Sequence, residues 1–218
     1  HLVQLLEKKA AGTQTYLLNR LSQLKSVEKG SVESYWVANM IYVRANIDAI
    51  TELSQLAEVD IIEALPEFET FDDPSLTAAP PVAPGSAEDN LLAINADELW
   101  RLGYTGYGTK VFVIDSGQDD KHPALRANFL GNTAPLREAW SGADAPEDCG
   151  VFHGTHVLGI VAGLDRITYD TIGVAYNAQW IGGPAGTLDD CDLIQNTRST
   201  LQNLQWALNP DGNSNTTD

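Results

Sequence analysis

The sequence predicts an α/β domain with a mostly parallel sheet and flanking helices, preceded by a small α+β unit. Strand patterns alternate with helix patterns from about residue 91 onward, which is typical of a parallel sheet. Residues 66–90 instead hold five prolines and no apolar periodicity, which indicates a linker. We therefore expect a first domain at residues 1–65, a linker at 66–90 and a second domain at 91–218.

The first domain combines helical and extended patterns. Residues 2–24 carry leucines at helical spacing, and residues 35–44 are rich in the aromatic and β-branched types that favour a strand or a hairpin. Residues 47–57 return to helical spacing after Asn46, a candidate cap, and residues 59–65 indicate a final strand. This order predicts a split β-α-β sheet that lacks its opening strand.

The second domain shows the alternation of a parallel sheet. Glycines separate a first helix from an apolar strand, and a glycine-rich helix and a second apolar strand follow. The expected elements are a helix ending near Leu102, a strand at 110–114, a helix from His153, a strand at 179–181, a helix over 193–208 capped by Asp189 or Asp190, and a polar loop at 209–218.

Charge and apolar content exclude some classes of partner. The net charge of −17 argues against nucleic acids and anionic membrane surfaces, which attract clustered Lys and Arg. No apolar run reaches the roughly 18 residues that indicate a membrane span. The two cysteines, Cys149 and Cys191, can form a disulfide, which would suit an oxidising compartment, or remain free thiols.

Asp115 and His153 are the residues that most clearly indicate chemistry. Asp115 ends an apolar strand, and functional groups in open α/β sheets collect beyond the carboxyl ends of strands. An acid in that apolar setting needs hydrogen-bond donors, and an imidazole N–H is a suitable one. A carboxylate behind His153 would fix the tautomer of the ring and stabilise the imidazolium that forms during proton transfer. The sequence therefore predicts an acid–base pair.

Simpler interpretations exist for each of these residues. Asp-Ser-Gly at Asp115 is a common turn, and His-Gly-Thr-His at His153 can be structural, but the two in this order and context favour catalysis. We expect His156 to be a packed helix residue and His122 a turn residue. A zinc site of Cys149, His153 and His156 lacks a fourth ligand at convincing spacing.

Four segments of residues 91–208 resemble the first half of the catalytic domain of subtilisin-like serine peptidases. They are Gly106-Tyr-Gly-Thr-Lys-Val-Phe-Val-Ile-Asp-Ser-Gly117, His122-Pro123, His153-Gly-Thr-His-Val-Leu-Gly-Ile-Val-Ala-Gly163 and Gly173-Val-Ala-Tyr-Asn-Ala178. The resemblance implies that Asp115 is the triad acid and His153 the general base. It also implies that residues near Gly182, Gly183, Gly186, Thr187 and Leu188 pair with the main chain of the substrate.

Residues 1–65 are similar to the inhibitory propeptide of the same family, in particular its bacillopeptidase F-like branch. The similarity rests on Ser34-Tyr-Trp-Val-Ala-Asn-Met-Ile-Tyr-Val43 and Val59-Asp-Ile-Ile-Glu-Ala-Leu65. It implies a ferredoxin-like α+β propeptide that assists folding and blocks the active-site cleft. The linker at 66–90 would then contain the maturation cleavage site, although an ordinary uncleaved spacer is an alternative.

The chain also departs from the family pattern. It lacks the Gly-Thr-Ser-x-Ala nucleophile motif, the oxyanion-binding Asn and the Ser-x-Gly substrate strand. Ala124 replaces an Asp that often helps to bind calcium, which puts that structural calcium site in doubt, and no cofactor is required for the chemistry. We expect a secreted serine endopeptidase precursor that cleaves polypeptides, with its serine on a second chain or segment. A truncated scaffold that serves as a binding or inhibitory module is the alternative, and a different hydrolase that reuses the Asp and the His is a third hypothesis.

Overall fold

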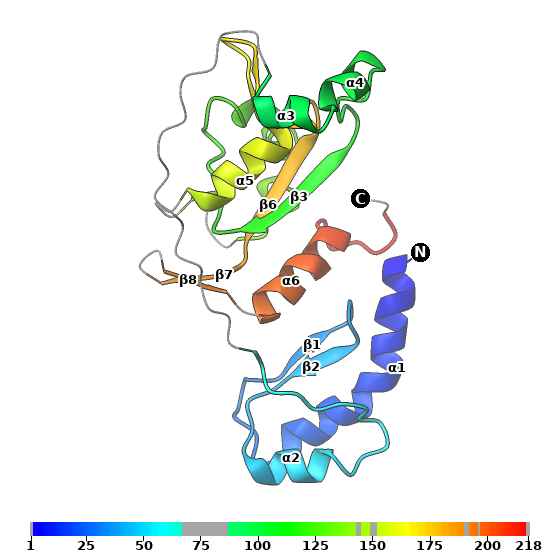
Figure 1. The fold of residues 1–218 in the computed structure, drawn as a ribbon. Coiled ribbons are helices and arrows are strands. Elements are labelled where there is room, and N and C mark those ends of the chain that lie inside the picture. Colours follow the sequence, from blue (N-terminus) through cyan, green and yellow to red (C-terminus); the bar gives the residue numbers. More distant parts are fainter. Residues whose placement is uncertain are drawn as a thin grey trace. The chain divides into compact units, whose positions relative to one another are not determined.

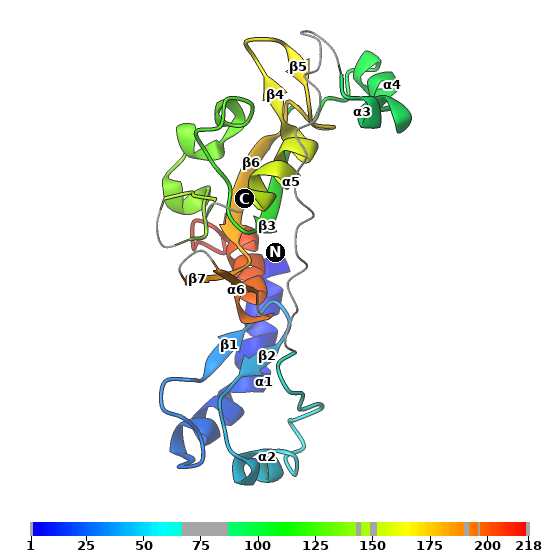
Figure 2. The ribbon, with the colours of Figure 1, turned by 60° about the vertical axis from the view of Figure 1, so that its left-hand side comes forward.

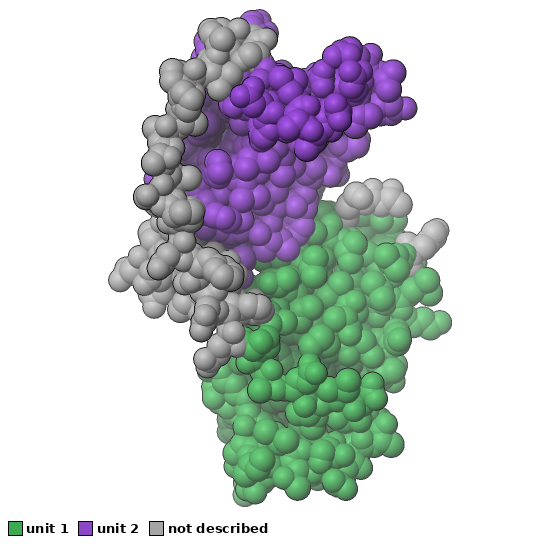
Figure 3. Space-filling model, viewed as in Figure 1, with its two compact units in different colours: residues 1–67, 196–218 green, residues 68–195 purple. Residues whose placement is uncertain are grey.

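A computed structural model describes residues 2–66, 87–142, 145–148, 152–189, 192–195 and 197–216 of the chain. The chain forms two compact units, one of residues 1–67 with 196–218 and one of residues 68–195 (Figure 3). Most of the predicted linker, residues 67–86, lies outside the described residues. The predicted domain boundaries at 65 and 90 therefore stay predictions.

The first unit contains three helices and one hairpin in its described part (Figure 1). They are α1 (Leu2–Gln23), β1 (Glu33–Tyr35), β2 (Met40–Tyr42), α2 (Ile47–Leu53) and α6 (Thr197–Leu208). The expected helix at 2–24 is confirmed, and that at 47–57 is confirmed for residues 47–53, since α2 ends at Leu53. Asn46 caps α2, since its side chain accepts hydrogen bonds from the amides of Asp48 and Ala49.

The split β-α-β sheet does not form in the described residues of this unit. Strands β1 and β2 pair antiparallel, with Tyr35 opposite Met40. The final strand predicted at 59–65 is wrong, because these residues are mostly exposed and have no strand partner among the described residues. Their apolar side chains suited a strand, but among the described residues they do not pair with either edge of the β1–β2 hairpin.

An apolar cluster packs α1 against α2, and a buried amide joins α1 to the hairpin. The cluster is formed by Leu21, Val27, Ala49 and Leu53. Gln14 of α1 is only 3% exposed, accepts a hydrogen bond from Ser34 and donates to Asn39 at 3.1 Å. Because every polar atom of this amide is paired, it fixes the hairpin against α1 at little net cost.

The second unit is organised around two parallel strands, β3 (Lys110–Asp115) and β6 (Gln179–Pro184). They run in register from Lys110 opposite Gln179 to Asp115 opposite Pro184. Helix α5 (His153–Ala162) contacts β3 and lies along the strand pair in both ribbon views (Figures 1 and 2). The predicted α/β class with a parallel strand pair and helices is confirmed.

Shorter elements complete the second unit. They are α3 (Asp89–Ala93), α4 (Ala96–Arg101), the 3-10 helices η1 (Arg126–Asn128), η2 (Leu130–Asn132) and η3 (Leu136–Glu138), and the strand pairs β4 (Leu164–Asp165) with β5 (Asp170–Thr171) and β7 (Gly186–Asp189) with β8 (Asp192–Gln195). The helix expected near 91–102 is thus two helices, divided at Asn95, whose φ of 57° leaves the helical region.

Trp180 of β6 is the largest fully buried side chain of the second unit. Its ring lies 4.4 Å from that of Phe129, measured between centroids, and its indole N–H donates to the Leu125 carbonyl at 2.8 Å. Burial of a large ring with its N–H satisfied anchors β6 below the segment that follows β3. Trp180 lies opposite Val111 near the amino ends of the strands, whereas the candidate site lies at their carboxyl ends, where Asp115 is opposite Pro184.

The start of the last helix differs from the prediction. Residues 193–195 belong to β8, and α6 begins at Thr197. Asp189 lies in β7 and does not cap α6, and Asp190 lies outside the described residues. The apolar residues at 193 and 194 fit the helical stripe by spacing alone, but the antiparallel pairing of β7 with β8 includes them instead.

Candidate active site

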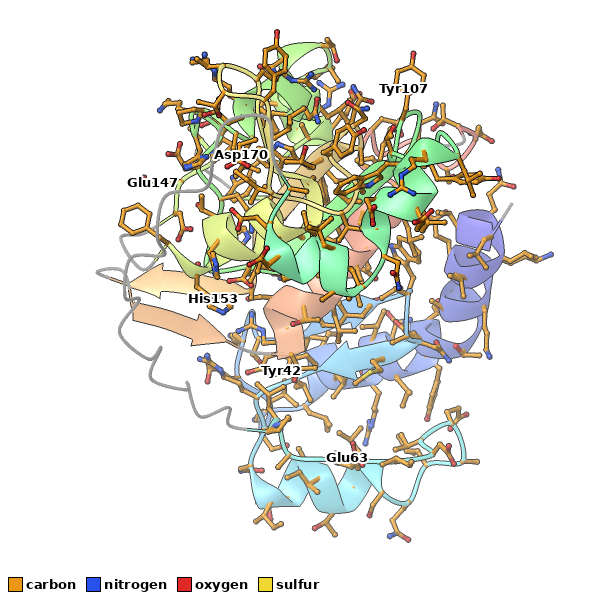
Figure 4. All side chains as sticks on the ribbon, turned by 45° about the horizontal axis from the view of Figure 1, so that its top comes forward. Tyr42, Glu63, Tyr107, Glu147, His153 and Asp170 are labelled. Atoms are coloured by element: carbon orange, nitrogen blue, oxygen red, sulfur yellow. The ribbon has the colours of Figure 1, made fainter. Side chains whose placement is uncertain are left out.

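Asp115 and His153 meet at the carboxyl end of β3. Asp115 is the last residue of that strand, and His153 is the first residue of α5, from which its side chain projects (Figure 4). Nδ1 of His153 lies 2.6 Å from Oδ1 of Asp115. The carboxylate is 15% exposed and the imidazole 50% exposed, so the pair has a shielded acid and an accessible base.

The surroundings of Asp115 fix the role of each ring nitrogen. Oδ1 also accepts a hydrogen bond from the Ser116 amide at 2.7 Å, and the Asp115 carbonyl accepts one from the Ala185 amide at 2.7 Å. A carboxylate only accepts hydrogen bonds, so His153 carries its proton on Nδ1 in the neutral ring. Nε2 is then the basic nitrogen, on the opposite side of the ring from Asp115.

Two glycines permit the close approach of the segments that carry the pair. A Cβ atom on Gly154 would overlap the carbonyl oxygen of Gly117, and a Cβ atom on Gly117 would overlap that of Glu147. Gly117 also has a φ of 119°, a conformation that side chains rarely adopt. The turn after Asp115 is therefore enclosed between the start of α5 and residues 147–148.

Asp148 links these segments, and sequence reasoning missed it. Its Oδ1 accepts from the Ser116 hydroxyl at 3.0 Å, and its Oδ2 accepts from the Thr155 amide at 2.7 Å. Asp148 is only 7% exposed, which is rare for a carboxylate without such donors. The sequence offered one signal, an acidic residue a few positions before a predicted helix start. Asp148 belongs to none of the motifs used above, so this signal was not used.

The other histidines have structural positions. His122 lies in a turn, as expected, and its Nδ1 accepts a hydrogen bond from the Ala124 amide at 3.3 Å. His156 was expected to be packed, but it is exposed on α5. That expectation was wrong, because a residue one turn along a helix from a site residue lies on the same face and need not point toward the core.

The five predicted substrate-binding residues separate into two strands. Gly182 and Gly183 are buried in β6, and the backbone N–H and carbonyl of Gly182 bond to Ala139 and Ser141. Both main-chain groups of Gly182 are thus bonded within the chain, and the role of Gly182 and Gly183 in pairing with a substrate stays a prediction. Gly186, Thr187 and Leu188 lie in β7, opposite β8, and their role stays a prediction.

The described residues do not fit a calcium site at Ala124. Its methyl side chain offers no ligand, and its carbonyl accepts the Leu164 amide at 3.0 Å. No group of three or more His, Cys, Asp or Glu in the described part of the chain could hold a metal ion. The possible disulfide of Cys149 and Cys191 lies outside the described residues.

Comparison with known proteins agrees with the acid–base pair seen in the structure. Residues 106–214 match the model of the Subtilase family. The chain is 31% identical to Bacillopeptidase F of Bacillus subtilis (strain 168) over 82% of its own length and 13% of that protein. It is 27% identical to the Minor extracellular protease Vpr of the same organism, over 84% of the chain and 26% of that protein. Subtilisin E is 32% identical over 53% of the chain and 28% of that enzyme. The chain thus spans about an eighth to a quarter of the first two relatives.

Proposed function

Because this chain belongs to the subtilase family of serine peptidases, we propose that it is part of a secreted serine endopeptidase precursor with an Asp-His-Ser triad. Asp115 is the acid and His153 the base, and the 2.6 Å contact between their side chains carries the proposal. Secretion is supported by similarity to a protease named extracellular. No described helix has the length and apolar character needed to cross a membrane.

The geometry supports the chemistry of acyl transfer to a serine. Nε2 of His153 removes the serine proton as Oγ attacks the peptide carbonyl, and returns that proton to the leaving amine. The acyl-enzyme is then hydrolysed by a water molecule that the same nitrogen activates. Asp115 holds the Nδ1 proton and stabilises the imidazolium formed in each step.

The serine is proposed to come from residues outside this sequence. None of the 218 residues forms a Gly-Thr-Ser-x-Ala motif, and Ser116, which follows the acid, uses its hydroxyl in bonds to Asp148 and Gly154. We therefore expect this chain alone to hydrolyse no peptide bond. Polypeptides are the proposed substrates of the completed enzyme.

The amino-terminal residues are proposed to act as an inhibitory propeptide. Within the first unit they fold against α6, which lies inside the region that matches the family. Arg198 of α6 pairs with Glu33 of β1 and lies 4.4 Å from the centre of the Tyr42 ring, which Figure 4 labels. Gln205 of α6 accepts hydrogen bonds from the backbone amide of Trp36 and from its neighbour.

Electrostatics at this contact support a specific association. Burial alone would raise the pKa of the Glu33 carboxyl, but hydrogen bonds from Arg198 and Tyr35 outweigh it and lower the pKa. Burial, together with the hydrogen bond to Glu33, raises the pKa of Tyr35 to about 12. A propeptide that docks by such bonds would hold the enzyme as a zymogen until the segment at 66–90 is cut, unless that segment is an uncleaved spacer.

The test uses the full-length precursor that contains these residues, matured and assayed with a fluorogenic peptide. His153→Ala should lower kcat on the order of 10⁶-fold, the size known from subtilisin itself when its base is removed. The control His156→Ala, at an exposed site on the same helix, should stay within about threefold of wild type. Equal activity of wild type and His153→Ala would refute the proposal.

A non-catalytic binding or inhibitory module is the second candidate, favoured by the missing nucleophile motif. A fluorophosphonate probe, which labels an activated serine covalently, distinguishes the peptidase from the binding module. Labelling of a polypeptide associated with this chain, lost in His153→Ala, supports the peptidase. Tight binding of a protein ligand without any labelling supports the module.

A further inference from the structure

The contact between Asp115 and His153 joins two elements that are far apart in sequence. One residue ends β3 and the other begins α5, and their sequence separation is 38 residues. A single hydrogen bond to a half-exposed imidazole does not by itself fix the distance and angle between a strand end and a helix start. Other contacts must hold the two backbones in place.

A closed ring of hydrogen bonds connects the neighbours of both residues through Asp148. The Ser116 hydroxyl donates to Oδ1 of Asp148 at 3.0 Å and accepts from the Gly154 amide at 2.9 Å. Oδ2 of Asp148 accepts from the Thr155 amide at 2.7 Å. Ser116 directly follows the acid and Gly154 directly follows the base, so the ring contains the residue next to each of them.

The far end of the same turn is attached to the same helix. The Asp119 amide donates to the Thr155 hydroxyl at 3.0 Å. Ser116, Asp148 and Thr155 are 2%, 7% and 8% exposed. Bonds buried to this degree compete little with water, and those to a carboxylate are stronger than neutral ones.

Helix α5 depends on this ring because it lacks a local cap. Phe152, at the cap position, has a φ of 55° and makes no side-chain hydrogen bond to the first turn. The amides of Gly154 and Thr155 would otherwise be unsatisfied in a buried setting, which costs about 1–3 kcal/mol for each group. The negative charge of a carboxylate beside the first turn also stabilises the helix, because the amino end of the helix dipole is positive.

We propose that Asp148 is a positioning residue for the candidate acid–base pair, which sets the approach of the His153 imidazole to the Asp115 carboxylate through Ser116 and the first turn of α5. Its catalytic consequence rests on the proposed function, but its effect on geometry does not. Asp148 bonds to the Ser116 hydroxyl and to the Thr155 amide, so it acts on the pair through these neighbours.

The first test reads the geometry directly in this 218-residue chain. A proton shared between imidazole Nδ1 and a carboxylate is strongly deshielded in NMR, and the chain has only four histidines, so His153→Ala assigns the signal. Asp148→Ala should move the His153 Nδ1–H signal upfield or remove it by exchange with water. Ser116→Ala should do the same, and the double variant should add little because both break one ring.

Asp165→Ala is the matched control. Asp165 also accepts backbone amides, those of Ile167 at 2.8 Å and Thr168 at 3.4 Å, but within its own loop. It should leave the His153 signal in place. If an Ala variant fails to fold, Asp148→Asn decides, because it keeps the shape of the side chain and offers one acceptor oxygen instead of two. A partial upfield shift is expected for it.

The second test is kinetic and uses the matured full-length enzyme. Asp148→Ala should lower kcat about 100-fold while KM changes by less than about threefold, since a displacement near 1 Å of a reacting group has that effect. An unchanged His153 signal in the folded Asp148 variants, or no deshielded signal in wild type, overturns the inference. If the 218-residue chain shows the signal and its response to Asp148, but the matured full-length wild type hydrolyses no peptide, the proposed function is refuted and the positioning role stays intact.

Discussion

Two buried glutamines provide a matched test of how this fold treats polar groups in its interior. Gln118, three residues after Asp115, is 0% exposed, and neither its Nε2 nor its Oε1 has a hydrogen-bond partner among the described residues. Gln14 of α1 is 3% exposed, and its amide is fully paired. Replacing each by methionine, which has nearly the same length and volume, should change stability in opposite directions.

The magnitudes follow from the contacts of each amide. An unpaired buried amide costs about 1–3 kcal/mol, so Gln118→Met should stabilise the second unit by about that amount. Gln14 accepts from Ser34 at 2.6 Å and donates to Asn39 at 3.1 Å. Loss of two such bonds, at about 1 kcal/mol each, predicts that Gln14→Met destabilises the first unit by about 2 kcal/mol.

Hydrogen exchange measured by mass spectrometry is the suitable assay. The chain has two units, so one unfolding midpoint would mix their stabilities. Amides of β3 and β6 report on Gln118, and those of β1 and β2 report on Gln14. Slower exchange in β3 and β6 of Gln118→Met confirms the reasoning. Faster exchange there would show that the amide has a bonded partner, such as an internal water, and would refute it.

Three further predictions concern the site and the first unit. Asp115→Asn should lower kcat of the matured enzyme on the order of 10⁴-fold, because the amide no longer fixes the tautomer of His153; losses of this size are known from serine peptidases including subtilisin. An unchanged kcat in a variant whose fold is intact by circular dichroism would contradict this. A carboxyl whose pKa is lowered on folding stabilises above the pKa of the unfolded chain and loses that contribution as pH falls through the folded value. Glu33 is such a group, so the protection of the β1 and β2 amides, corrected for the pH dependence of intrinsic exchange, should fall below about pH 4.5. Glu33→Gln should flatten this dependence, and an unaltered dependence would exclude the Glu33–Arg198 pair as its source. Gly154→Ala should displace α5 and destabilise the second unit, read as faster hydrogen exchange in β3 and β6, because its Cβ would overlap the Gly117 carbonyl oxygen. Gly159→Ala meets nothing within 4 Å and should instead stabilise that unit by about 0.5–1 kcal/mol; equal effects would show that Gly154 is not sterically required.

The parts of the fold that the sequence predicts well are those with a dominant local pattern. Strand β3 and helix α5 were both expected at their observed positions, because apolar runs and glycine-flanked turns delimit them. Residues 59–65 have equally apolar side chains but form no strand, because a strand needs a partner edge that no local pattern specifies. The start of α6 was misplaced for the same reason, since pairing between β7 and β8 determines it.

The candidate site shows the same division between chemistry and geometry. Asp115 and His153 are recognisable from sequence because an acid after a buried strand and an imidazole on a glycine-rich turn suit proton transfer. The distance between them depends on Asp148, a residue in none of the motifs, which reaches both neighbours only after the chain has folded. A mutation at Asp148 would leave every motif intact and still separate the acid from the base. Variation at such positions should therefore alter catalysis in chains whose motifs are complete, and the NMR signal of His153 is the observable that registers it.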